Sequence, residues 1–428
     1  WKSIAPKAFV NCSKLYIAEL PATIKTVGRN AFAGCSALQG VLSYSEDTMT
    51  VGEGAFDDTW NLRFLAFDAL YLDFYDYTGS AAVYASCNGI GYNGADRFSP
   101  SYEIDDVNGG KLLYGIAADE DGNAIDGSYL LGATLGVSGN LKLRDNASEI
   151  AGNVFENCAN AFTLDGMDHI IAIGANAFNN SGISGKIEIT GSYEYVGDYA
   201  FSGCSNITEV EIDGSGLDKR LYIRPFGSNV FSWCSGIERL TITGGGNYDL
   251  CENAFMGCTS LATVAIDEDA GLREIMYGAL SMTAISYIKL PKGLDGIGYG
   301  AFESCSNLTQ VVLTGTNVPE LFVYAPGMQF TFGSTLGDEG WLSIPEGMEQ
   351  DYIDLWKYYM IGRTPEDAPF LTDEELLDSE NVVRKLLGME PVSSNADSPA
   401  GKVDNDSVAT AGDAKKEEKA TESMEGER

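Results

Sequence analysis

The chain has 428 residues, of which 62 are Asp or Glu and 27 are Lys or Arg, so its formal net charge at pH 7 is −35. That acidic excess repels phosphate backbones and argues against nucleic acid as a partner. No apolar run approaches the roughly 18 residues of a membrane-spanning helix, so we expect no direct membrane insertion. The 44% hydrophobic content can supply the core of several domains or of one long repeat array.

The first 15 residues, WKSIAPKAFVNCSKL, lack the basic start and the apolar stretch of a signal peptide. They contain an Ala-Phe pair at residues 8–9 and a cysteine at Cys12, and both features recur further along the chain. We therefore expect the sequence to begin inside a repeat array and to be part of a longer protein.

An apolar pair, Ala or Val followed by a large residue, recurs mostly every 22 to 25 residues. The second members of the pairs, here called the anchors, are Phe9, Phe32, Phe56, Phe155, Phe178, Phe201, Phe231, Phe255, Leu280 and Phe302. After each anchor, apolar and polar residues alternate, as in Val210 and Ile212 beside Glu209 and Glu211. This pattern predicts one short strand per repeat of about 23 residues, and the repeats must stack to bury their apolar faces. The predicted fold is a leucine-rich-repeat-like solenoid.

Residues 196–212 resemble one family's repeat, I-G-x-x-A-F-x-x-C-x-x-L-x-x-I-x-I, almost position by position. That family is the BspA-like leucine-rich repeats of bacterial surface proteins, and ten such copies spread over residues 4–313. Residues 79–90, GSAAVYASCNGI, also resemble the segment that often closes a block of these repeats. The resemblance implies a solenoid, an extracellular or cell-surface location, and a role in adhesion or protein binding.

The period divides the chain into five parts. We expect a first repeat block at 1–90, an irregular or β-hairpin interruption at 91–146, and a second repeat block at 147–318. A C-terminal cap with two helices should follow at 319–390, and a disordered acidic linker at 391–428, which is rich in small and charged residues and has no aromatic ones. Within the interruption, the turn residues DEDGN at 119–123 favour a hairpin.

Two helices are predicted in the cap. The first begins after Pro345 and places large apolar residues on one face. These are Met348, Tyr352, Leu355, Trp356 and Tyr359. The second begins at Thr372, where Glu375 three residues later makes a capping box, and it ends at Gly388.

The sequence has nine cysteines, and seven of them occupy one repeat position. They are Cys12, Cys35, Cys158, Cys204, Cys234, Cys258 and Cys305. Thr59 and Ser181 stand at the same position in other repeats, so the position requires a small side chain, and we predict a ladder of buried thiols. Disulfides between adjacent repeats are the alternative. Metal binding is disfavoured because no C-x-x-C pair exists. Cys251 replaces a glycine of the repeat, and Cys87 is the thiol to test for reactivity.

The sequence offers no catalytic or cofactor-binding residues. His169 is the only histidine, lies beside Asp168 in a predicted turn, and has no partner at the spacing of a catalytic or metal-binding pair. The segment 119–126 has its glycine at the fourth position, whereas a calcium-binding loop needs it at the sixth. We therefore predict no enzyme activity, no cofactor and no metal.

The polar face of the stacked strands is either a solvated surface or a recognition surface. Its outward positions are Lys186, Glu188, Glu209, Glu211, Arg239, Thr241, Thr263, Tyr287, Lys289 and Gln310. Lys186 and Arg239 should flank Glu209 across neighbouring strands and offset some carboxylate repulsion. An insertion at 216–226 adds a basic spot, and such insertions often form the binding loop of a solenoid. The candidate partner contacts are Lys219, Arg220, Arg224, Glu209, Glu211, Arg239 and Tyr287.

These features favour a binding module that engages a host or microbial surface protein. The alternative is a non-catalytic glycan-recognition or substrate-presenting module of a larger secreted enzyme. That alternative is motivated by a run of aromatic residues, namely Tyr71, Phe74, Tyr75 and Tyr77. A hydrolase is the weakest of the three hypotheses.

Overall fold

The structure is a computed structural model that describes part of the chain. The described residues are 1–43, 49–66, 69–70, 98–118, 124–215, 226–322, 340–361 and 363–393. Trp1–Glu390 form one compact unit. Several predictions lie outside the described residues: the closing segment at 79–90 with Cys87, the aromatic run at 71–77, the turn at 119–123, the three basic residues of the insertion, and all but the first three residues of the acidic linker.

The first repeats build two small parallel sheets. The order of one sheet is β2 (Ile17–Leu20), β4 (Gly40–Ser43) and β6 (Phe64–Ala66), and that of the other is β1 (Ser3–Ile4), β3 (Thr26–Val27), β5 (Met49–Val51) and β7 (Ala69–Leu70). The sheet of longer strands is the one predicted. The second sheet adds a short strand to each repeat, formed by residues ahead of the anchor such as Val27. The solenoid is confirmed, but most of the described repeats contribute two strands and not one.

An antiparallel segment follows. Strands β8 (Phe98–Val107), β9 (Gly110–Ala118) and β10 (Ala124–Ala133) pair in that order, which confirms the hairpin that the turn residues predicted. Strand β10 then pairs in parallel with β12 (Ala147–Ile150). The antiparallel segment therefore joins the sheet of the second repeat block directly.

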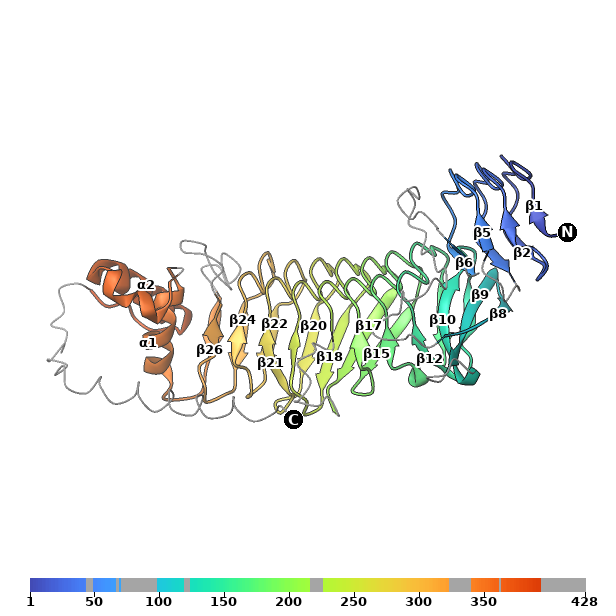
Figure 1. Cartoon of the computed structure of the whole chain (residues 1–428). Helices are drawn as coiled ribbons and strands as arrows, with labels where there is room; N and C mark the ends of the chain where they lie inside the picture. Colours follow the sequence, from blue (N-terminus) through green and yellow to red (C-terminus); the bar gives the residue numbers. More distant parts are fainter. Residues whose placement is uncertain are drawn as a thin grey trace, which may run out of the picture. The chain divides into compact units, whose positions relative to one another are not determined.

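The second block continues the two-sheet arrangement, and its strands follow one another in a row in Figure 1. The longer strands are β11 (Gly139–Lys142), β13 (Phe162–Asp165), β15 (Gly185–Thr190), β17 (Ile207–Asp213), β18 (Arg239–Thr243), β20 (Thr263–Ile266), β22 (Tyr287–Leu290), β24 (Gln310–Leu313) and β26 (Trp341–Ser343). The other sheets add β14 (Ala172–Ile173), β16 (Tyr195–Val196), β19 (Tyr248–Leu250), β21 (Leu272–Ile275), β23 (Gly296–Ile297) and β25 (Glu320–Leu321). Because β25 and β26 still pair with repeat strands, the sheets extend past the predicted boundary at residue 318.

Each anchor sits in a turn whose backbone fixes the stacking. The residues two before and two after it adopt left-handed backbone conformations, as Asn176 and Asn180 do around Phe178. Asn and Gly tolerate that conformation best and fill most of these positions. The anchor's N–H donates to the next repeat, for example from Phe178 to the Ala200 carbonyl at 2.7 Å. The phenylalanine rings consequently stack with centroids 4.8 to 5.5 Å apart, which adds directional packing to their burial.

The thiol ladder is confirmed for the described cysteines, which are free and, apart from the half-buried Cys12, buried. Most of the buried thiols donate to the carbonyl of the preceding repeat's anchor, as Cys204 does to Phe178 at 2.9 Å and Cys258 to Phe231 at 3.1 Å. The position therefore needs a small donor, which explains the occasional Thr or Ser. Burial raises the pKa of Cys258 to about 12, so this thiol is un-ionised at neutral pH.

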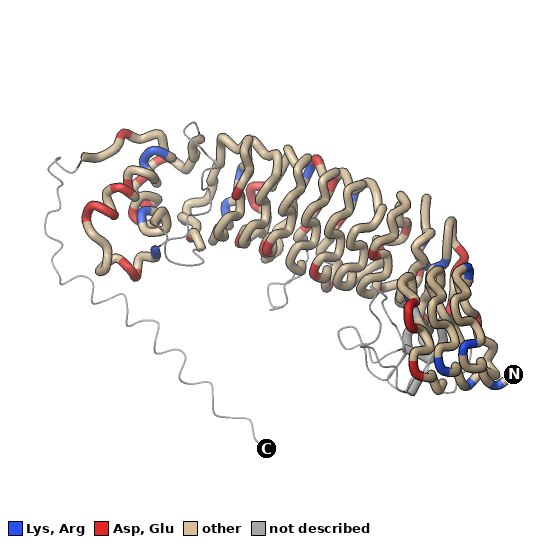
Figure 2. The backbone as a smooth tube through the Cα atoms, turned by 90° about the horizontal axis from the view of Figure 1, so that it is seen from above, with Lys and Arg blue, Asp and Glu red and all other residues tan. Residues whose placement is uncertain are grey.

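Two helices cap the last repeats, α1 (Glu349–Tyr359) and α2 (Asp373–Leu386), and short 3-10 turns occur at η2 (Met167–His169) and η3 (Pro365–Phe370). The Thr372–Glu375 capping box is present at the start of α2. Helix α1 buries Tyr352, Ile353, Trp356 and Tyr359, and the Trp356 indole N–H donates to the Pro319 carbonyl at 2.9 Å. Leu355 and Met348, which were predicted for the same face, are half-buried. Figure 2 shows acidic positions gathered on these helices.

A buried arginine joins the two repeat blocks. The Arg63 guanidinium donates to the carbonyls of Asn153 at 3.0 Å and Val154 at 3.3 Å. Val154 directly precedes the anchor Phe155. In uninterrupted repeats the carbonyl of the residue at this position accepts a hydrogen bond from the anchor N–H of the preceding repeat, as the Ala177 carbonyl does from Phe155. The Asn153 carbonyl also accepts from the Glu156 N–H at 3.2 Å, so the acceptor that Arg63 supplies with a donor where the regular stacking begins again is the Val154 carbonyl.

Candidate binding surface

Charged residues from three adjacent strands, β15, β17 and β18, lie together on the outward face of their sheet. The register places Lys186 of β15 beside Glu209 of β17, and Glu209 beside Arg239 of β18. One step further along the strands, Glu188 lies beside Glu211. We call these five residues the charged row. The predicted placement of Lys186 and Arg239 on either side of Glu209 is confirmed.

The charges of the row are partly compensated within it. Lys186 Nζ lies 2.7 Å from Glu188 Oε1 and 2.5 Å from Glu211 Oε2, and these hydrogen bonds raise the pKa of the lysine. Arg239 Nε is 3.7 Å from Glu209 Oε1, a looser contact. The side chains are 37% to 61% exposed, so water screens these pairs and they add little to stability. Three carboxylates against two cations leave the row net acidic.

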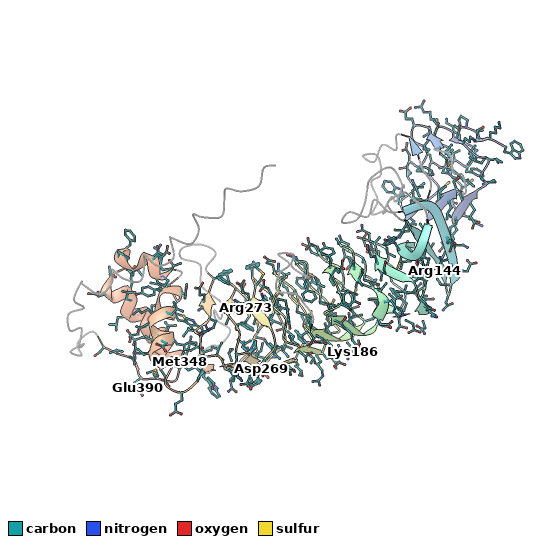
Figure 3. The ribbon with its side chains drawn as sticks, turned by 60° about the horizontal axis from the view of Figure 1, so that its bottom comes forward. Arg144, Lys186, Asp269, Arg273, Met348 and Glu390 are labelled. Carbon is teal, nitrogen blue, oxygen red and sulfur yellow. The ribbon has the colours of Figure 1, made fainter. Side chains whose placement is uncertain are left out.

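A depression of about 360 Å³ adjoins the row between β13 and β15. Leu164, Met167 and Ile187 contribute apolar surface to it, while Lys186 and Glu188 contribute polar groups. The Tyr193 hydroxyl donates to the Met167 carbonyl at 3.3 Å and holds the adjacent turn in place. Figure 3 labels Lys186 on this stretch of the chain. The sequence alone did not indicate this depression.

His169 lies in the 3-10 turn next to that depression. Its Nε2 is 3.7 Å from Asp168 Oδ2, and its side chain is 50% exposed. A half-exposed histidine in a turn matches the solvent-facing residue that the sequence predicted, whereas a catalytic histidine needs a nucleophile held beside it. Among the described residues, no cluster of three His, Cys, Asp or Glu side chains could hold a metal ion. No helix in the described part of the chain has the length and apolar character needed to cross a membrane.

A second outward row has a different chemistry. Tyr287 of β22, Gln310 of β24 and Trp341 of β26 are register partners on three paired strands. The two aromatic side chains are 45% and 47% exposed. We call these three residues the aromatic row. Tyr287 and Gln310 were predicted to face outward, whereas Trp341 was not identified. The alternation of Trp341, buried Leu342 and Ser343 was the available signal for it.

Of the seven predicted contacts, Glu209, Glu211 and Arg239 lie together in the charged row, and Tyr287 lies apart from them in the aromatic row. Lys219, Arg220 and Arg224 lie outside the described residues. Lys186 and Glu188, which were expected on the outward face, complete the charged row.

Stacked parallel strands, a repeated anchor turn and a polar outward face define a repeat protein of the leucine-rich class. Residues 2–80, 138–219 and 224–325 match the family described as BspA type Leucine rich repeat region, in six copies. The chain belongs to that family. No curated protein sequence matches the chain.

Solved structures with a similar fold come from several bacteria. A leucine-rich repeat protein from Bacteroides ovatus is 18% identical, with a TM-score of 0.42 over 81% of this chain and 88% of that one. A leucine rich cell surface protein from Faecalibacterium prausnitzii is 15% identical, with a TM-score of 0.32 over 84% and 86%. The pneumococcal vaccine antigen PcpA is 16% identical, with a TM-score of 0.39 over 81% and 71%.

Proposed function

We propose that this protein is an extracellular or cell-surface binding module that mediates adhesion by engaging a host or microbial surface protein. The observation that carries the proposal is the charged row, in which charged side chains from three hydrogen-bonded strands lie in register beside a depression. The cell-surface location rests on the resemblance to the BspA-like repeats of bacterial surface proteins.

The row suits recognition because its side chains stand on a rigid support. Residues on paired strands lose little freedom on binding, which lowers the entropic cost of association. Glu209, held only loosely by Arg239, is available to a cationic group of the partner. The neighbouring depression can receive one of the partner's apolar side chains, and such a buried anchor supplies a large share of binding energy.

The sequence offers a further set of candidate contacts, the basic residues of the insertion, which lie outside the described residues. Lys219, Arg220 and Arg224 would contact acidic groups of the partner, so the partner surface is of mixed charge. The proposed function is binding without catalysis. Replacing His169, the only histidine, with Ala should therefore leave capture of the partner unchanged.

The test uses the full chain and intact epithelial and bacterial cells, with and without protease shaving. Shaving should abolish binding because the partner is a protein. The double variant Glu209→Gln/Glu211→Gln should weaken binding about two- to fivefold for each lost ion pair. It should also reduce the dependence of binding on salt concentration.

The matched control is Glu346→Gln/Glu366→Gln, which removes two exposed carboxylates far along the sequence from the row. It should bind as the unmodified chain does. Binding that survives shaving, or an equal loss in both double variants, would overturn the proposal.

A further inference from the structure

We infer that the aromatic row is a binding platform for a neutral oligosaccharide. Tyr287, Gln310 and Trp341 stand on adjacent strands in a fixed order, aromatic, amide, aromatic. The residues that follow them on the inward face, Ile288, Val311 and Leu342, are buried. The core below therefore holds the three strands, and with them the outward side chains, in place.

The geometry of the row fits a sugar chain. Adjacent strands lie about 4.8 Å apart, so the backbones at Tyr287 and Trp341 are roughly 10 Å apart, close to the length of an extended disaccharide. Each aromatic ring offers an electron-rich face, on which the C–H groups of one face of a pyranose ring can stack. Gln310, between the rings, carries both donors and an acceptor for sugar hydroxyls.

The charge of the row selects a neutral ligand. The row contains no Asp, Glu, Lys, Arg or His side chain. The nearest outward cation along β22, Lys289, has its Nζ 3.9 Å from Glu268 Oε2, and Lys292 lies 3.5 Å from Glu268 Oε1. Glu268 thus balances positive charge beside the row, while the net charge of −35 disfavours an anionic polysaccharide. A neutral polyhydroxyl chain is the partner whose charge matches.

This inference goes beyond the proposed function because it concerns other strands and another class of ligand. Purified soluble oligosaccharides test it without any protein partner. The probes are hexasaccharides of β1,4-linked glucose, β1,4-linked N-acetylglucosamine and α1,6-linked mannose, with a heparin hexasaccharide as the anionic comparison. Isothermal titration calorimetry with the full chain measures the dissociation constant for each probe.

We expect at least one neutral probe to bind, with an affinity that 0.5 M NaCl leaves unchanged. Trp341→Ala and Tyr287→Ala should each weaken that binding about tenfold, the effect of truncating an aromatic contact. Trp341→Phe and Tyr287→Phe should keep most of the affinity because they keep a ring. Trp60→Ala is the matched control, since Trp60 is 53% exposed in a different repeat, and it should change nothing.

Several results would overturn the inference. The first is that no neutral probe binds at millimolar concentration. The second is that only heparin binds, in a salt-dependent way. The third is that Trp60→Ala lowers affinity as much as Trp341→Ala does. A thermal melt of each variant separates loss of binding from loss of folding, and Tyr287→Ala decides the question if Trp341→Ala unfolds.

Discussion

The charged row and the aromatic row both occupy outward positions on the longer strands of the repeats, yet their side chains differ in charge and polarity. Lys186, Glu209 and Arg239 form a chain of opposite charges, whereas Tyr287, Gln310 and Trp341 are uncharged. Beneath both rows the inward residues are buried aliphatic side chains. The difference shows that this solenoid separates the residues that stabilise it from those available for recognition.

That separation follows from the alternation of a β-strand. Successive side chains point to opposite faces, so a change on the outer face leaves the inner packing untouched. Because each repeat contacts chiefly its neighbours, one part of the outer face can also change without affecting another. Four predictions test this independence.

The largest effect is expected from Phe201→Ala, in the anchor turn that precedes β17 of the charged row. The Phe201 ring stacks between Phe178 at 4.8 Å and Phe231 at 5.1 Å and is fully buried. Removing it should cost about 3–5 kcal/mol of unfolding free energy and leave a cavity. Hydrogen exchange should become faster in β15, β17 and β18 and stay unchanged in β24 and β26. Uniform acceleration over both rows would contradict their independence.

Leu342→Ala, beneath the aromatic row, should have the reciprocal effect. Leu342 is buried on β26, and its truncation should cost about 2–5 kcal/mol. We expect the lower end of that range because β26 has a paired strand on one side only among the described residues. Sugar binding should be lost while cell binding through the charged row persists. Parallel calorimetry and cell-binding assays check this, and simultaneous loss of both would refute it.

Salt should distinguish the rows without any mutation. Raising NaCl from 50 mM to 500 mM shortens the range of electrostatic interactions and should weaken cell binding several-fold. Binding of the neutral oligosaccharide should stay constant, because its contacts involve no ions. The measurement is the dissociation constant for each ligand across a salt series. Equal sensitivity of the two ligands would mean that the rows do not differ in the way proposed.

The smallest effect concerns the stability of the charged row itself. Lys186→Gln should lower the unfolding free energy by no more than about 1 kcal/mol, since the pairs are largely exposed. The carboxylates raise the folded-state pKa of Lys186 above its ordinary 10.5, so the lysine's contribution is fully present below that pH. It disappears only as the pH rises through the folded-state value. Urea unfolding of both proteins at pH 7, 9 and 11 should show the difference shrinking at pH 11 alone.

Much of the fold could be predicted because the same packing pattern recurs ten times along the chain. The anchors, the thiol position and the alternation of Val210 and Ile212 each follow from local spacing. The capping box of α2 follows from the spacing of Thr372 and Glu375. The second strand of each repeat escaped prediction because segments such as Thr26–Val27 are too short to show a period. The left-handed residues on either side of each anchor, which include Tyr199 and Trp233, carry no single sequence signal.

By itself, the sequence determined which side chains face the core and which face solvent, because a strand's alternation is a local property. It also determined that a solenoid forms, since no single repeat can bury its own apolar face. The alignment of the repeats predicted that Lys186 and Arg239 flank Glu209, but only the tertiary structure decided which other outward residues become neighbours. Trp341 joins Tyr287 and Gln310 because β26 pairs with β24 after the period has stopped. Lys186 pairs with Glu188 of its own strand and also reaches Glu211, because β15 and β17 lie in one register. Register depends on the stacking of whole repeats, which no local pattern specifies.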